Sequence, residues 1–123
     1  MDAHYVFRVR FRLDAPGVDA DPETFETVVR YPAPEPGDDE GRWRFFEEWL
    51  WRGELTDERR FKAVMSEWLS VPVDRVTFSE LEVTAAYLDA WEDRVAAELG
   101  RYNADSVRAV RHNHLGSSLR VLD

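Results

Sequence analysis

The segment that most constrains the fold is the stretch of residues 43–53, which holds three tryptophans and two phenylalanines in eleven residues. Large aromatic side chains dominate the energetics of cores and interfaces, so we expect the rest of the chain to fold against this stretch. Its apolar residues recur at helical spacing, which predicts a helix over about residues 41–52 that Gly53 caps. Because this helix is apolar around most of its circumference, it is either covered on two sides or leaves one side for a partner. Its predicted apolar face comprises Trp43, Phe46, Trp49 and Leu50.

Alternation with a period of two predicts a pair of strands near the start of the chain. Residues 5–13 alternate between large apolar side chains and arginines, and residues 24–31 show the same period. A short loop joins them, so we expect antiparallel neighbours, with Glu26 opposite the arginines of the outer face. Those arginines are Arg8, Arg10 and Arg12.

The rest of the chain alternates between helical and strand patterns. An amphipathic pattern predicts a helix that begins at Thr56 as N-cap and closes at Ser70. A second helix begins at Thr84 and ends at Gly100 or Tyr102. The other predicted elements are strands over residues 74–83 and 118–122 and a helix over residues 104–114 that Asn103 caps and Gly116 ends.

The predicted order of elements, β-β-α-α-β-α-α-β, is typical of the α+β class. We expect residues 1–123 to form a single α+β domain, in which helices pack on one face of a mostly antiparallel sheet. The alternation of the third strand slips between Phe78 and Leu81, which predicts either a bulge or an early end of the strand.

The charge balance is strongly acidic. The chain has 25 Asp and Glu against 16 Lys and Arg, its formal net charge is −9, and Lys62 is its one lysine. Molar salt shortens electrostatic screening to about 3 Å, so surplus carboxylates no longer repel one another while they keep the surface hydrated. We therefore favour adaptation to high salt; a GC-rich genome is the alternative explanation for the scarcity of lysine and the absence of isoleucine.

Several locations and activities are excluded at this stage. No apolar run is long enough to span a membrane, and the first residues lack the pattern of a signal peptide. Cysteine is absent, which excludes disulfides and thiolate chemistry. We expect a cytoplasmic protein without a cofactor and without membrane contact.

Enzymatic motifs are also missing. The chain has no nucleophile elbow, no dinucleotide-binding fingerprint and no metalloprotease helix, so we expect no catalytic residues. His112 and His114 would share one face in a strand, where they could ligate a metal, but they would diverge in a helix. A small metal-dependent enzyme that uses them is therefore an alternative.

The candidate contact surface combines two short segments. Residues 51–53 join an aromatic ring to a bidentate donor, and Trp and Arg are enriched at interface hot spots, although Arg52 could equally complement a helix dipole. The turn at residues 115–118 could offer amides and hydroxyls to an anion, or it could simply end a helix. If the fold brings the segments together, they could jointly hold an anion or a partner's carboxylate. The candidate residues are Trp51, Arg52, Gly53, Gly116, Ser117 and Ser118.

The arginines of the first strand offer another alternative. Arg8, Arg10 and Arg12 share one strand face and could hold the phosphates of a nucleic acid. However, the aromatic residues that would stack bases fall on the opposite face, and an acidic chain steers nucleic acid poorly. We therefore expect no nucleic acid partner; the alternative predicts that these arginines are exposed and unpaired.

Three short segments together resemble the LWR-salt proteins of halophilic archaea. They are Leu-Trp-Arg-Gly at residues 50–53, Phe-Glu-Thr at 25–27 and Leu-Gly-Ser-Ser at 115–118, and the resemblance covers about residues 5–121. It implies an archaeal cytoplasm rich in salt, and it brings no assigned activity and no functional residues. We therefore predict a small halophilic, non-enzymatic binding or accessory module with a possible protein partner, and the oligomeric state stays open.

Overall fold

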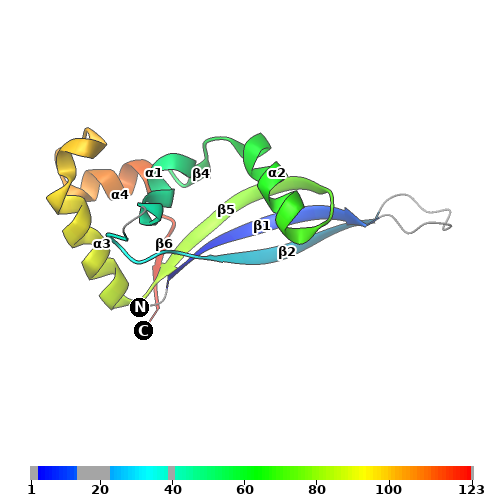
Figure 1. The fold of residues 1–123 in the computed structure, drawn as a ribbon, viewed down its shortest axis with the longest axis horizontal. Helices are drawn as coiled ribbons and strands as arrows, with labels where there is room; N and C mark the ends of the chain where they lie inside the picture. Colours follow the sequence, from blue (N-terminus) through cyan, green and yellow to red (C-terminus); the bar gives the residue numbers. More distant parts are fainter. Residues whose placement is uncertain (1–2, 14–22, 39–40, 123) are drawn as a thin grey trace.

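One four-stranded sheet forms the base of the fold. Its strands are β1 (Ala3–Leu13), β2 (Glu23–Pro32), β5 (Val73–Val83) and β6 (Leu119–Val121). The structure is a computed structural model that describes residues 3–13, 23–38 and 41–122. The strand order is β2-β1-β5-β6, in which β1 pairs antiparallel with β2 and β5, and β6 runs parallel to β5 (Figure 1). The chain therefore has the predicted α+β fold with a mostly antiparallel sheet.

The alternating pattern of β1 divides its side chains between the two faces of the sheet. Tyr5 and Phe7 are fully buried on the inner face, whereas Arg8 and Arg10 are exposed on the outer face. The pairing of β1 with β2 places Arg10 opposite Glu26, as predicted. Inner-face burial and outer-face charge therefore follow directly from the period of two.

The predicted bulge lies in β5. Val6 of β1 is opposite Glu80, but the next residue, Phe7, is opposite Phe78, so Ser79 is an extra residue on β5. The extra residue returns Leu81 to the inner face, where it is buried.

Helix α2 (Glu58–Leu69) lies across one face of the sheet, as Figure 1 shows. Phe61 and Met65 are its buried residues. Asp57 is the N-cap, because its carboxylate accepts a hydrogen bond from the amide of Arg60 at 3.0 Å. The prediction of Thr56 as the cap was therefore wrong by one residue.

The remaining helices gather at the end of the sheet near both termini (Figure 1). They are α3 (Ala85–Ala97), the short 3-10 helix η2 (Leu99–Tyr102) and α4 (Val107–Leu115). Thr84 caps α3 as predicted. The cap of α4 is Ser106, and the prediction of Asn103 was wrong, because Asn103 takes a left-handed conformation at the end of η2. Among the described residues, no helix is long and apolar enough to cross a bilayer.

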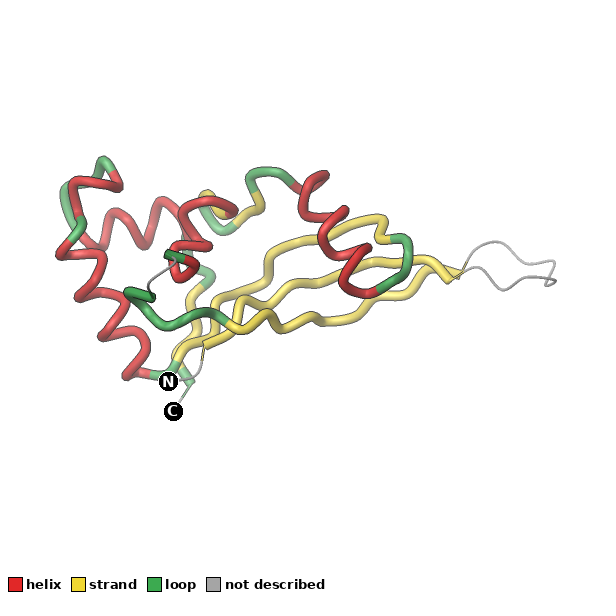
Figure 2. The backbone as a smooth tube through the Cα atoms, viewed as in Figure 1, coloured by secondary structure: helices red, strands yellow, loops and turns green. Residues whose placement is uncertain are grey.

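The aromatic stretch is a shorter helix than predicted, followed by a hairpin. The chain forms the 3-10 helix η1 (Arg42–Arg44), α1 (Phe45–Trp49), β3 (Leu50–Trp51) and β4 (Glu54–Leu55), which the backbone tube in Figure 2 follows. Arg52 and Gly53 have φ angles of 53° and 80°, as in a type I′ turn, so Gly53 is a turn residue and not a helix cap. Trp43, Phe46 and Leu50 of the predicted apolar face are nevertheless almost fully buried.

Candidate functional site

The fold brings the two candidate segments together at one joint, which we call the hairpin joint. It consists of the turn at Arg52 and Gly53 and the C-terminal end of α4. The amide of Arg52 donates a hydrogen bond to the carbonyl of Asn113 at 2.6 Å, and the amide of Gly53 donates to the carbonyl of His114 at 3.0 Å. The last carbonyls of a helix have no partner within the helix, so the hairpin supplies the missing donors.

Two glycines permit this close approach. A Cβ atom on Gly53 would lie 2.8 Å from the hydroxyl of Ser118 and 3.0 Å from the carbonyl oxygen of Leu115. A Cβ atom on Gly116 would lie 3.2 Å from the backbone of Arg52. Both glycines also have positive φ angles, which other residues adopt only with strain. These two glycines therefore have a structural role at the joint.

The buried side chain of His114 packs beneath the hairpin and contacts its backbone. Its Nδ1 atom lies 2.9 Å from the carbonyl oxygen of Leu50, and its ring makes edge-on contacts with Phe46 and Trp51. His114 is buried, whereas His112 is exposed on a different face of α4. The pair diverges as helical geometry requires, and no cluster of three metal-binding side chains exists within the described residues.

The backbone of the turn after α4 is already occupied. The amide of Gly116 donates to the carbonyl of His112, and the amide of Ser118 donates to the carbonyl of Leu115. These two amides therefore cannot hold an anion without breaking the turn. What the joint presents to solvent is the half-exposed indole of Trp51, with the guanidinium carbon of Arg52 5.8 Å from its ring centre.

A second surface, which sequence analysis did not identify, is a groove of about 1080 Å³ between β2, α1 and α2. We call it the aromatic groove. Tyr31 stacks on Phe45 at 5.6 Å, Phe45 stacks on Trp49 at 6.1 Å, and Trp68 meets the ring of Tyr31 edge-on at 6.1 Å. Its apolar lining comprises Tyr31, Pro34, Phe45, Trp49, Phe61, Val64, Met65 and Trp68. Its charged lining comprises Arg42, Arg44, Glu47, Glu48, Glu67 and Arg101.

The sequence contained one sign of this groove. Residues 43–53 are apolar around most of a helix, and the structure covers one side, with Trp43 and Phe46, while Phe45 and Trp49 line the groove on the other. The contribution of Tyr31 from β2 could not be foreseen, because it depends on how the strand and helices pack.

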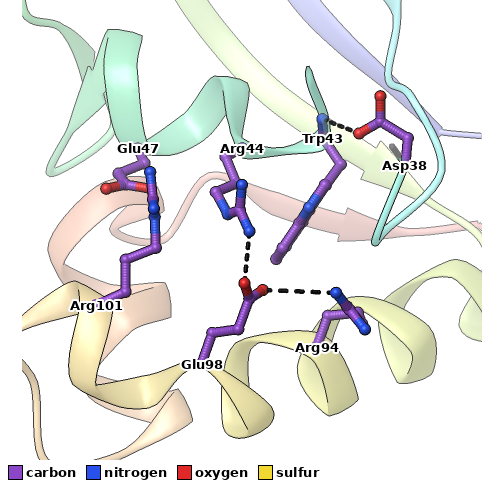
Figure 3. A network of polar contacts seen from close by, with 7 residues as sticks. All are labelled: Asp38, Trp43, Arg44, Glu47, Arg94, Glu98 and Arg101. Carbon is purple, nitrogen blue, oxygen red and sulfur yellow. Dashed lines mark hydrogen bonds and ion pairs between the residues drawn. The ribbon is translucent and has the colours of Figure 1, made fainter. Parts of the chain in front are cut away.

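Several of the charged residues that line the groove form ion pairs. Figure 3 shows Arg44 and Arg94 directed at Glu98, at distances of 2.5 and 4.0 Å, while Arg101 pairs with Glu47 at 3.0 Å. Burial disfavours the charged form of Arg44, but the hydrogen bond and charge of Glu98 outweigh burial and raise the pKa of Arg44. This network holds η1 and α1 against the C-terminal end of α3 and against η2.

Three buried tyrosines remain protonated at neutral pH. Burial raises the pKa of Tyr5 well above its ordinary value, and it also raises the pKa of Tyr87 and of Tyr102. A phenol with a raised pKa is a poor general base near neutral pH. These groups therefore contribute packing rather than acid-base chemistry.

The outer-face arginines are only partly available to a polyanion. Arg10 lies 3.4 Å from Glu26, and Arg12 lies 3.0 Å from Asp74. Arg8 is exposed and has no ion-pair partner among the described residues. Two of the three arginines are therefore bridged to acids, which is the arrangement expected without a nucleic acid ligand.

Comparison with known proteins gives one match. The model of the LWR-salt protein family matches residues 1–123. No curated protein and no solved structure matches the chain. The resemblance to this family rested in part on residues 50–53 and 115–118. These two segments meet at the hairpin joint. The chain belongs to the LWR-salt protein family.

Proposed function

We propose that this protein is a non-enzymatic binding module and that its aromatic groove holds an extended segment of a partner protein. The observation that carries the proposal is the half-exposed ring of Trp68 above a continuous row of aromatic contacts from Tyr31 to Trp49. A concave surface lined by hydrophobic and aromatic side chains, with charged groups that can orient a ligand, is a common form of ligand site.

The chemistry of the groove favours a protein segment as the ligand. Aromatic-lined grooves bind extended, proline-containing segments well, because such segments lose little entropy on binding. Glu67 lies at the edge of the groove and has no ion-pair partner among the described residues. We therefore expect the bound segment to combine bulky apolar side chains with a lysine or arginine near Glu67.

A displayed library of extended peptides, rich in proline and aromatic residues, tests this proposal in molar KCl. Enriched peptides should bind the intact protein and lose at least about tenfold in affinity for the Trp68→Ala variant. The Trp51→Ala variant removes an equally exposed tryptophan outside the groove and should bind as the intact protein does. Equal enrichment on the Trp68→Ala variant, or no enrichment at all, would reject the groove as the binding surface.

The hairpin joint is a proposed second contact. Trp51 and Arg52 present an aromatic ring and a guanidinium on a rigid turn, and no carboxylate pairs with Arg52 in the part of the chain that the structure describes. A carboxylate of the same partner would suit this position. If the contact exists, Arg52→Ala weakens binding to a full-length partner without changing its affinity for an isolated groove peptide.

We further propose that the protein works in a cytoplasm rich in salt, as its net charge of −9 suggests. Screening of surplus carboxylates should raise the midpoint of thermal unfolding between about 0.1 M and about 3 M KCl. Replacing the exposed carboxylates of Asp89 and Asp93 with Asn should make this dependence shallower. A midpoint that does not change with KCl would contradict the proposal.

A further inference from the structure

Within the described residues, β2 is an edge strand of the sheet with which another strand could pair. β2 is an edge strand of ten residues, and its pairing with β1 runs without a register shift. Native proteins normally block such edges with lysines, prolines or bulges. β2 contains no lysine, and its proline, Pro32, is the last residue. The side chain of Val28, in the middle of the strand, is 60% exposed.

The backbone direction along β2 can be read from one hydrogen bond. The amide of Ala33 donates to the carbonyl of Ala3 at 2.9 Å, so Ala33 directs its backbone groups toward β1. Because this direction alternates along a strand, the odd-numbered residues of β2 also face β1. The even-numbered residues therefore direct their amides and carbonyls toward the free edge. They are Thr24, Glu26, Val28 and Arg30.

We propose that a second copy of this chain pairs with this edge, antiparallel and with its two-fold axis at Val28. Even-numbered residues then face even-numbered residues, as the backbone directions require. Glu26 lies opposite Arg30 of the partner subunit, and Val28 lies opposite Val28 of the partner subunit. Two four-stranded sheets become one continuous eight-stranded sheet, in the isologous arrangement typical of homodimers.

Charge complementarity selects this register. Within one chain, Glu26 already pairs with Arg10, and Arg30 pairs with Glu82. Joining the edges at Val28 continues this order of alternating charges across the seam and adds two pairs of opposite charge. An axis at Thr27 would also match the backbone directions, but it would place Glu26 opposite a valine and forfeit both pairs.

The exposed apolar side chains support the same register. Phe25 and Tyr31 lie on the inner face and are each 38% exposed, and the axis at Val28 sets Phe25 beside Tyr31 of the partner subunit. Cross-strand aromatic pairs stabilise a sheet. The inference does not depend on what the aromatic groove binds.

Sedimentation equilibrium in about 2 M KCl tests the association of two chains directly. The intact chain should be a dimer, and Val28→Lys should weaken it by about tenfold or more, because the apolar contact on the axis is replaced by two long, strongly hydrated lysine side chains. Thr77→Lys is the matched control, since Thr77 is exposed on the same outer face of β5, away from the edge. A monomeric intact chain, or equal weakening by the control, would overturn the proposal.

Single cysteines test the register, because the natural chain has none. Residues that face each other across an antiparallel pair have Cα atoms about 5.5 Å apart, within reach of a disulfide. Val28→Cys should therefore oxidise to a covalent dimer much faster than Thr77→Cys. If Thr27→Cys oxidises fastest instead, the axis lies at Thr27 and the register proposed here is wrong.

Discussion

The hairpin joint and the aromatic groove border the same short aromatic segment, but they are built from different kinds of contact. At the joint, backbone amides meet backbone carbonyls, and two glycines let the segments approach. In the groove, aromatic rings contact one another and leave open space beside them. A close-packed backbone joint tolerates no added atom, whereas an exposed side chain can change with little loss of stability.

The hairpin joint stabilises the fold, whereas the aromatic groove is a surface that is open to a ligand. Two segments that the sequence analysis singled out as a contact surface, at positions 50–53 and 115–118, hold the helix α4 to the hairpin. The surface best suited to a ligand lies on the other side of α1, where single aromatic residues from separate elements meet. Substitutions should therefore separate the two regions cleanly, one through stability and the other through binding.

The largest expected effect is unfolding at alkaline pH, which disrupts the hairpin joint and the aromatic groove together. Tyr5 packs against Phe45 beneath the groove, and Tyr102 stacks on Phe46 near the joint. Burial raises the pKa of both phenols in the folded chain, whereas unfolded tyrosines ionise near pH 10. Stability is therefore complete below about pH 10 and falls as the pH rises toward the folded pKa values.

Circular dichroism during a pH titration measures this loss. The Tyr87→Phe variant supplies the comparison, because it removes one buried phenol whose pKa is also raised. Its alkaline midpoint should lie at a higher pH, even though it loses the hydrogen bond from Tyr87 to the carbonyl of Pro34. A fold that is unchanged by strong alkali would show that these phenols are not buried as described.

The next largest effect breaks the joint alone. Gly53→Ala should destabilise the fold by about 3 kcal/mol or more, through positive φ strain and contact with a carbonyl oxygen. Gly100→Ala is the matched control, because a Cβ atom there meets nothing within 4 Å. Urea unfolding of the two variants gives the comparison; equal stability would mean that the hairpin can separate from α4 without cost.

A smaller effect tests the polar contact inside the joint. His114→Phe keeps a ring against Phe46 but removes the hydrogen-bonding partner of the Leu50 carbonyl, at a cost of about 1 to 3 kcal/mol. His112→Phe changes an exposed residue on the same helix and should cost far less. Equal costs for both variants would place His114 outside the joint's stabilising contacts.

The smallest expected effect on stability belongs to the groove. Trp68 is 53% exposed, so Trp68→Ala should cost about 1 kcal/mol or less. Binding of the peptides selected by the library should nevertheless fall sharply. Urea unfolding and peptide titration on the same sample separate the two quantities; a large loss of stability would make Trp68 part of the core instead of a binding residue.

Much of the fold could be predicted from local patterns. The alternation at residues 5–13 and 24–31 predicted both strands and their antiparallel pairing, because side-chain direction in a strand repeats every two residues. The break between Phe78 and Leu81 predicted a bulge or an early strand end for the same reason, and the structure has the bulge. The caps Thr56 and Asn103 were wrong, since several nearby polar residues can cap a helix and only packing chooses among them.

The candidate site depended far more on tertiary structure. The sequence singled out residues 51–53 and 115–118, but only the fold showed that they meet and that their backbone groups are already bonded. It likewise predicted an apolar helix with one free side, but not that Tyr31 and Trp68 would complete a groove beside it. Local patterns predicted most of the strands and helices and their apolar faces, because those depend on residues two to four positions apart, but they missed the hairpin of β3 and β4. Contacts between distant residues decide which segments touch and which surface stays open to a partner. Local patterns do not contain these contacts, so they became visible only in the folded chain.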